Sequence, residues 1–402
     1  MRERAFICDP VCALPYGHNV VGLKYFSEAS KPFYNTIIPI ASTCLPEDIA
    51  LKYGFERGFE FYYYNHINID PINKIPSAHS LSSDYDLMIE LAIQDMSTIY
   101  EKYVISENDA LFFPCVDYYG AMAILELLYR ISPPKTPFVY FRFIGVMENA
   151  TSIGLSGLPK LLKDIKKMLA AGYKIKLCAE TPRYADSLAS DLATFVNVVP
   201  YPTHTDMIKK LTIIEGGGEE YKDIFTVVCP GSARCDKGYL DLFDIFSTIR
   251  KIDPRQSIKF VVQGLPVADS LQHTSYTNQL YAIPGVKILH STLSEEEMNE
   301  LYSLSDLVLL PYDTAIYAFR GSAVFMECIS RGIPVIALAG SAFCDQIIYY
   351  GAGSVVPEIG SFANEILQYR YVSKPTLITK MYQARHRYSI DADYAFIQWM
   401  TP

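Results

Sequence analysis

The sequence predicts an α/β protein made of two doubly wound, parallel sheets. Short apolar runs alternate with segments of helical spacing along most of the chain, a pattern typical of parallel strands joined by helices. The alternation breaks over residues 201–223, where a proline, a triple glycine and charged residues gather, and then resumes. A chain of 402 residues also exceeds one ordinary core. We therefore expect Rossmann-like domains at 1–202 and 203–385.

In the first domain, apolar runs and helical spacing define the elements. The expected strands are 5–9, 34–41, 110–116, 138–145 and 174–180, and the expected helices are 20–29, 84–104, 119–131, 158–170 and 182–192. Pro182 suits a first helical position, because its fixed backbone fits a helix start that needs no N–H there. Residues 56–82 are rich in Tyr and Asn and predict no regular element.

In the second domain the same reasoning gives a further set of alternating elements. The expected strands are 225–229, 258–263, 286–290, 307–310, 335–338 and 354–357, and the expected helices are 238–251, 294–303, 323–331 and 362–369. Gly332 and Pro334 follow the 323–331 helix and are normal residues for ending one. The C-terminal tail reads as two helices broken near Ser389.

Composition excludes several classes of protein. A net charge of −9 argues against a nucleic-acid binder. Nine scattered cysteines without paired spacing indicate reduced thiols rather than a disulfide framework or a zinc site. No run reaches the ~18 apolar residues that span a bilayer, and the N-terminus lacks an apolar signal core. We therefore expect a cytoplasmic protein.

The loop after strand 307–310 has the chemistry of a phosphate site. Glycine at 321 lets a ligand approach the backbone, and the following helix start offers free N–H groups with a partial positive charge. Glu327 lies one helical turn further on and could accept the two hydroxyls of a vicinal diol. An ordinary strand–helix–strand unit, with Glu327 bonded to a neighbouring backbone group, explains the pattern equally well.

A second loop, after strand 225–229, carries two cations. Arg234 and Lys237 follow Pro-Gly-Ser and precede a helix. Both loops are at carboxyl ends of strands, where open α/β sheets bind ligands. An Arg grips a diphosphate with two parallel hydrogen bonds and a Lys adds a point charge, although a solvated loop would look the same.

Taken together, these stretches resemble the donor half of glycosyltransferases of the GT-B fold, in particular glycosyltransferase family 4. The resemblance covers about residues 224–360 and rests on the order and spacing of PGSARCDKGYLDL, KFVVQG, VKILHSTLSEEEMNELYSLSDLVLLPY and RGSAVFMECISRGIPVIAL. It implies two Rossmann-like domains that face a central cleft, with about 386–402 forming a helix that crosses back to the first domain. It also implies a retaining enzyme.

The resemblance assigns roles to residues of this chain. It implies that Arg234 and Lys237 contact the donor diphosphate, that the amides of 321–323 contact phosphate, and that Glu327 binds the donor ribose. The donor-binding residues expected on this basis are Gly231, Ser232, His290, Tyr317, Arg320, Gly321, Ser322, Ala323 and Glu327. Phe319 stands where the family has the first of two glutamates, so the sugar contacts differ here.

The acceptor side should come from the first domain. His18 sits at a helix start and could orient or deprotonate an acceptor hydroxyl, although a capping or surface histidine is the alternative. Asp117 ends a strand and could do the same, or it could be the N-cap of the next helix. Arg142, inside a strand, would need a partner such as Glu148 or the donor. We count Arg234, Lys237, His18 and Asp117 as candidate catalytic residues.

Two further features bear on partners. Lys160, Lys163, Lys166 and Lys167 form a basic helix face that suits either anionic lipid or plain solvent. The triplets Asp84–Asp86 and Asp391–Asp393 fall in helical segments and do not supply the converging oxygens that a metal needs. We therefore expect a metal-independent transfer from a nucleoside-diphosphate sugar to a glycan or lipid-linked acceptor, with no other cofactor. The alternatives are a nucleotide-sugar epimerase, a phosphorylase, for which no pyridoxal lysine is evident, and a degenerate, non-catalytic protein.

Overall fold

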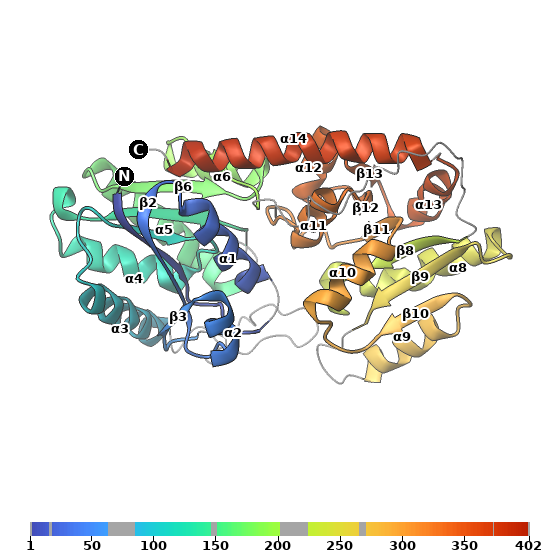
Figure 1. Ribbon diagram of the computed structural model, residues 1–402, viewed down its shortest axis with the longest axis horizontal. Helices are drawn as coiled ribbons and strands as arrows, with labels where there is room; N and C mark the ends of the chain where they lie inside the picture. Colours follow the sequence, from blue (N-terminus) through green and yellow to red (C-terminus); the bar gives the residue numbers. More distant parts are fainter. Residues whose placement is uncertain are drawn as a thin grey trace. The chain divides into compact units, whose positions relative to one another are not determined.

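The computed structural model describes residues 2–15, 18–62, 85–145, 151–201, 224–264, 271–372 and 374–400. Among these, residues up to 201 together with 392–400 form one compact unit, and 224–391 form another. Each unit contains one parallel sheet with helices packed around it (Figure 1). The predicted α/β architecture of two doubly wound sheets is therefore confirmed.

The first unit has seven parallel strands in the order β3-β2-β1-β4-β5-β6-β7. Its strands are β1 (Arg2–Asp9), β2 (Tyr34–Ser42), β3 (Glu56–Phe59), β4 (Ala110–Phe113), β5 (Phe138–Phe143), β6 (Ile175–Ala179) and β7 (Asn197–Val198). Its helices are α1 (His18–Ser30), α2 (Glu47–Tyr53), α3 (Tyr85–Tyr103), α4 (Tyr118–Tyr129), α5 (Thr151–Ala170) and α6 (Pro182–Leu192). β1 pairs with β2 on one side and β4 on the other, so the chain reverses its direction of travel across the sheet there.

The second unit has six parallel strands in the order β10-β9-β8-β11-β12-β13. They are β8 (Phe225–Cys229), β9 (Ile258–Gln263), β10 (Val286–Leu289), β11 (Leu307–Leu310), β12 (Val335–Leu338) and β13 (Gly353–Val356). The helices are α8 (Leu242–Ile252), α9 (Leu271–Tyr281), α10 (Glu295–Leu304), α11 (Ala323–Arg331), α12 (Phe343–Tyr350), α13 (Phe362–Tyr371) and most of α14 (Lys374–Met400).

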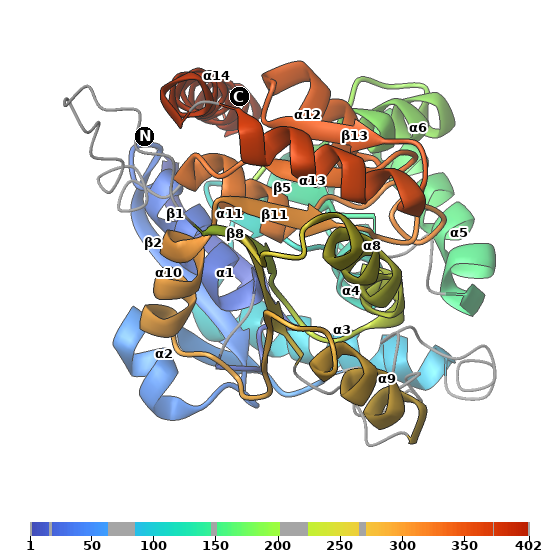
Figure 2. The same cartoon turned by 90° about the vertical axis from the view of Figure 1, so that its right-hand side faces the viewer.

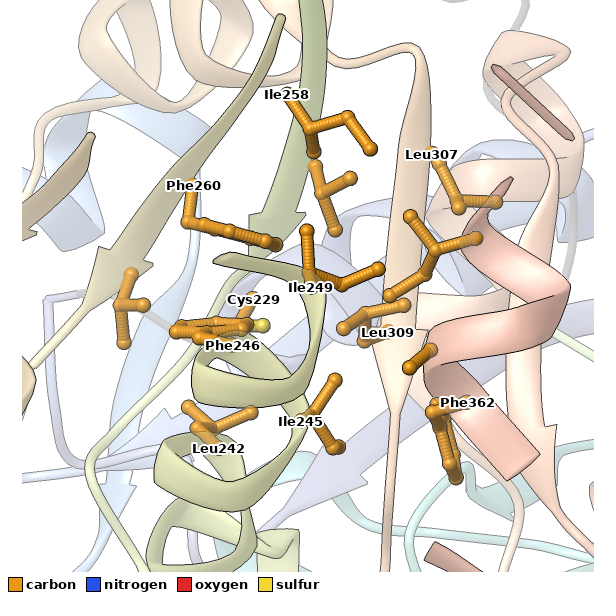
Figure 3. Packing of buried hydrophobic residues seen from close by; sticks show 14 of the residues in the cluster. Cys229, Leu242, Ile245, Phe246, Ile249, Ile258, Phe260, Leu307, Leu309 and Phe362 are labelled. Carbon is orange, nitrogen blue, oxygen red and sulfur yellow. The ribbon is translucent and has the colours of Figure 1, made fainter. Parts of the chain in front are cut away.

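The core of the second unit lies between its sheet and two of these helices. α8 and α13 lie side by side against the sheet (Figure 2). The rings of Phe246 on α8 and Phe260 on β9 stack with centroids 4.0 Å apart, and Leu309 of β11 packs beside Ile249 (Figure 3). These apolar contacts hold β8, β9 and β11 together and so fix the loops at their carboxyl ends.

The C-terminal tail is one helix, α14, and the expected break near Ser389 is wrong. Ser389 is a poor helix former, but the only proline of α14, Pro375, lies in its first turn, and neither glycine nor proline occurs near Ser389. Packing of the residues around Ser389 therefore keeps the helix continuous. Tyr388 packs on Tyr350 within the second unit, with ring centroids 5.2 Å apart. Trp399 and Phe396 are buried in the core of the first unit, where Trp399 lies 4.8 Å from the Phe112 ring.

Several elements differ from the sequence prediction. The helices α2, α9 and α12 and the short strands β3 and β7 were not expected. α5 begins at Thr151 rather than at 158, because glycines and Pro159 in its first turns look like loop residues in sequence. Of the expected connection at 201–223, all residues after Tyr201 lie outside the described part of the chain. No helix in the described ranges is long and apolar enough to cross a membrane.

Candidate active site

The predicted donor residues gather where the second sheet changes direction. β8 lies between β9 and β11, so the chain first moves to one side of β8 and later to the other. Open α/β sheets bind ligands at this switch point, outside the carboxyl ends of the strands. The loops that leave β8 and β11 there carry Arg234, Lys237 and the 317–323 segment.

The two loops touch through their backbones. The amide of Asp313 donates a hydrogen bond to the carbonyl of Asp236, with an N···O distance of 2.9 Å. Gly238 has φ of +70°, and a Cβ there would lie 2.0 Å from the carbonyl oxygen of Pro311. Only glycine fits this position, because it accepts positive φ and has no side chain in the gap. The loops are therefore locked against each other before any ligand arrives.

Arg234 is held by a carboxylate two residues away. Its Nε donates to Asp236 Oδ1 at 2.7 Å, and Nη2 donates to Oδ2. Burial opposes the charge on the guanidinium, but the hydrogen bonds with Asp236 and the nearby Tyr317 raise the pKa of Arg234 overall. The guanidinium therefore stays charged and oriented in a half-buried place.

Lys237 and Arg320 lie over a pair of tyrosine rings. The rings of Tyr312 and Tyr317 have centroids 4.6 Å apart. Lys237 Nζ lies 5.9 Å from the first ring centroid, and Arg320 Cζ lies 5.9 Å from the second. These are cation–π distances. The structure thus brings Lys237 close to the loop that contains Tyr317 and Arg320.

Gly231 shapes the space beside Lys237. Its φ is +107°, and a Cβ would lie 2.8 Å from Lys237 Nζ. The Gly231 amide donates a hydrogen bond to Gln263 Oε1 at 2.7 Å, so this N–H already has a partner within the protein. Gln263 was not among the residues predicted from the sequence. The next residue, Ser232, accepts a hydrogen bond from the Arg234 amide through its carbonyl oxygen at 2.8 Å. The contribution of 231–232 is therefore a tight turn that places the cations.

α11 begins beside these cations. Ser322 is its N-cap and accepts a hydrogen bond from the Phe325 amide at 3.2 Å, which uses one of the free N–H groups of the helix start. Gly321 precedes the cap, and Ala323 is the first helical residue. Burial raises the pKa of Glu327, while Arg331, a hydrogen bond with Tyr302 and the charge of Lys237 each oppose the rise. Glu327 therefore lies within electrostatic reach of Lys237.

His290 follows β10, at the same carboxyl edge of the sheet. It is exposed and hydrogen-bonds through Nε2 to the hydroxyl of Tyr281. β9 separates β10 from β8, so His290 lies further from the switch point than the other predicted donor residues.

The first unit places carboxylates at its own switch point, between β1 and β4. Asp117 is the N-cap of α4, and its Oδ1 accepts from the Gly120 amide at 2.9 Å, which supports the capping interpretation. Its Oδ2 is buried and has no hydrogen-bond partner within the described part of the chain. Burial raises the pKa of Asp117. His18 is the first residue of α1, and its side chain lies outside the described residues.

Asp9, at the end of β1, is a residue that sequence reasoning missed. It is fully buried and accepts hydrogen bonds from Asn19 Nδ2 at 3.0 Å and from the Val11 amide at 3.1 Å. Burial raises the pKa of Asp9 to about 7, and the neighbouring Asp117 adds to the rise. A carboxylate directly after an apolar strand, before Pro10, was the signal available in the sequence.

Arg142 has a structural partner other than the expected ones. It is fully buried and pairs with Glu180, with Nη2 3.0 Å from Oε1. Its other nitrogens donate to the carbonyls of Pro114 and Val199, at 3.0 and 2.9 Å. The expected partner Glu148 lies outside the described residues, and pairing with a donor is wrong, because these groups already enclose the guanidinium.

No group of three or more His, Cys, Asp or Glu side chains that could hold a metal occurs in the described ranges. Asp84 of the first Asp triplet lies outside them, and Asp391 and Asp393 lie on α14.

Solved structures share this fold over almost the whole chain. A glycosyltransferase from Rickettsia africae has a TM-score of 0.64 at 13% identity, with 99% of this chain and 96% of that chain covered. A trehalose-6-phosphate protein from E. coli, bound with UDP-2-fluoro glucose, has a TM-score of 0.67 at 11% identity over 99% and 97%. Sucrose-phosphate synthase from Thermosynechococcus elongatus has a TM-score of 0.63 at 15% identity over 99% and 97%.

Residues 224–370 match the family model for glycosyl transferases group 1. The chain therefore has the GT-B fold, and its second unit matches a glycosyltransferase family. The family match covers the second unit, which carries the cations and the α11 start, while the likeness of the first unit rests on fold alone. The comparison with curated protein sequences finds no match.

The second unit groups features that suit a negatively charged ligand. Two cations and a helix start lie on loops that are already fixed, so little rearrangement is needed when negative charge develops. Tyr312 and Tyr317, on which Lys237 and Arg320 lie, are both buried. The arrangement suits recognition of a phosphorylated ligand.

Proposed function

We propose that this GT-B-fold protein is a glycosyltransferase that moves a sugar from a nucleoside-diphosphate sugar to a hydroxyl of a glycan or lipid-linked acceptor. The proposal includes retention of anomeric configuration, no metal and a place in cell-surface polysaccharide or glycoconjugate synthesis. The observation that carries it is the contact between the loops after β8 and β11, which groups Arg234, Lys237 and the start of α11 at the switch point.

In the proposed reaction, the bond between the sugar and the diphosphate breaks as an acceptor hydroxyl oxygen bonds to the anomeric carbon, and the proton of that hydroxyl passes to the departing diphosphate. Arg234 and Lys237 stabilise the charge on the leaving diphosphate, and amides at 321–323 contact its oxygens. Glu327 accepts the two ribose hydroxyls of the nucleoside. Asp117 is the acceptor-side group, since its buried Oδ2 has hydrogen-bonding capacity left in the described part of the chain.

A second candidate is a protein that binds sugar nucleotides without transferring the sugar. Phe319 favours it, because an aromatic ring stands where the family carries a glutamate. The two functions differ in turnover: an enzyme slowly hydrolyses its donor without an acceptor, and a binding protein does not. A nucleotide-sugar epimerase would convert the sugar of the free donor, which product analysis of the same incubation reveals.

We expect one class of nucleotide sugar to raise the unfolding temperature of the wild type, because a ligand that binds only the folded state stabilises it by mass action. UDP sugars are the first to test, since a structure of similar fold is bound with UDP-2-fluoro glucose. Glu327→Gln should reduce that shift, and Glu365→Gln, on α13, is the matched control. Equal shifts for wild type and Glu327→Gln would contradict the ribose assignment. No shift with any nucleotide sugar would contradict the proposed function.

The lysine face of α5 supports a further part of the proposal, peripheral contact with the inner face of a membrane. Lys160, Lys163 and Lys166 are exposed, and so is Lys167, which pairs with Asp164 at 3.3 Å. Replacing the four lysines by glutamate should abolish sedimentation with vesicles that contain anionic lipid, since each basic side chain adds about 1 kcal/mol of attraction. Neutral vesicles are the control. Undiminished sedimentation of the variant with anionic vesicles would exclude this surface.

A further inference from the structure

One buried carboxylate links the parts of the donor site. Asp236 lies between Arg234 and Lys237, in the short 3₁₀ turn η4 (Cys235–Lys237), and is 1% exposed. Its two carboxylate oxygens accept hydrogen bonds from Nε and Nη2 of Arg234, so Asp236 binds one edge of the guanidinium. Parallel hydrogen bonds of this kind fix both the position and the plane of an arginine.

The same residue also holds the loop after β11. Oδ2 accepts a hydrogen bond from the Tyr317 hydroxyl at 3.4 Å, and the backbone carbonyl accepts from the Asp313 amide at 2.9 Å. Asp313 Oδ1 in turn accepts from the amides of 315 and 316, at 2.8 and 3.0 Å, which shapes the turn that leads to Tyr317. Asp236 is thus the common partner of the Arg234 side chain and of this turn.

We propose that Asp236 is a positioning residue of the donor site, which holds Arg234 by its Nε–Nη2 edge so that Nη1 is presented to the diphosphate. This inference rests on the proposed function. Asp236 also fixes the position of the Tyr317 ring through its hydrogen bond with the Tyr317 hydroxyl. Arg320 lies over this ring, with Cζ 5.9 Å from the ring centroid. Arginine carries about 2 kcal/mol of rotamer entropy, and a guanidinium that is already ordered loses less of it when the ligand binds.

The test measures binding of inorganic pyrophosphate by titration calorimetry, because this probe needs neither nucleoside nor sugar. We compare wild type, Asp236→Asn, Arg234→Lys and the double variant. Asp236→Asn keeps the size of the side chain and should weaken binding about ten-fold, a usual size for coupled neighbours. Once Arg234→Lys has removed the group that Asp236 orients, adding Asp236→Asn should change affinity by less than about two-fold. Asp244→Asn, exposed on α8, is the matched control.

Three results overturn the proposal: unchanged affinity in Asp236→Asn, losses that multiply fully in the double variant, or no pyrophosphate binding by the wild type. If Asp236→Asn does not fold, the affinity of Arg234→Lys for pyrophosphate tests the proposal, because this variant keeps the charge but loses the two parallel hydrogen bonds to Asp236. An affinity within two-fold of wild type then overturns the proposal. Pyrophosphate binding without any nucleotide-sugar binding would contradict the proposed function and still test Asp236.

Discussion

Replacing Lys237 by methionine is expected to lower kcat/KM for the donor by about 100-fold or more, the usual cost of removing one group that stabilises charge developing in a transition state. Methionine keeps most of the length and apolar contact of the lysine stem, so the change removes mainly the ammonium beside Tyr312. The measurement is initial-rate kinetics with the donor found in the nucleotide-sugar panel. The loss should appear in kcat as well as in KM, because the leaving diphosphate carries more charge in the transition state.

Lys251→Met is the matched control for this prediction. Lys251 is exposed in the last turn of α8, in the same unit, and its loss should leave kcat/KM unchanged. If Lys237→Met raised KM alone and left kcat intact, Lys237 would contribute to ground-state binding but not to charge stabilisation. Unchanged kinetics would remove Lys237 from the donor site.

Gly238→Ala is expected to cost about 2–4 kcal/mol of stability, the sum of positive φ in a residue with a side chain and of steric overlap in a packed place. The added methyl would meet the Pro311 carbonyl oxygen at 2.0 Å. Because backbone rather than a flexible side chain blocks it, the loops after β8 and β11 must separate. Nucleotide binding should therefore fall with stability, which thermal unfolding and calorimetry measure on the same sample.

Gly351→Ala separates the cost of positive φ from the cost of steric overlap. Gly351 has φ of +70°, like Gly238, but a Cβ there meets no atom within 4 Å. It should cost about 1–2 kcal/mol from the backbone alone and leave nucleotide binding intact. Equal losses in both variants would mean that the loop contact at Pro311 contributes nothing.

The elements around the donor loops were predictable because their signals are local. β8, β9, β11 and β12 are short apolar runs, and Gly332 ends α11 with φ of +71°, as glycine after a helix does. The pairing of Arg234 with Asp236 was not predicted, although both residues lie in the same quoted stretch. An Asp two positions from an Arg forms an ion pair only if the turn brings them together, and sequence spacing does not fix that turn.

Contacts distant in sequence were also beyond prediction. Arg142 was recognised as needing a partner, but Glu180, directly after β6, became evident only from the register of β5 and β6. Gln263 looked like an ordinary strand end until Gly231 was found bonded to it. The continuity of α14 escaped the sequence pattern because packing on the cores, not helix propensity, carries it past Ser389.

The burial of Trp399 and Phe396 has a consequence for biosynthesis. Most of the first unit precedes the second in the chain, yet residues that fill its interior follow the second unit. At ~5–20 residues per second, translating the roughly 200 residues between the two portions takes about 10–40 s. During that interval the nascent first unit lacks the Trp399 ring that packs on Phe112, so its core can be completed only after the second unit has been synthesised.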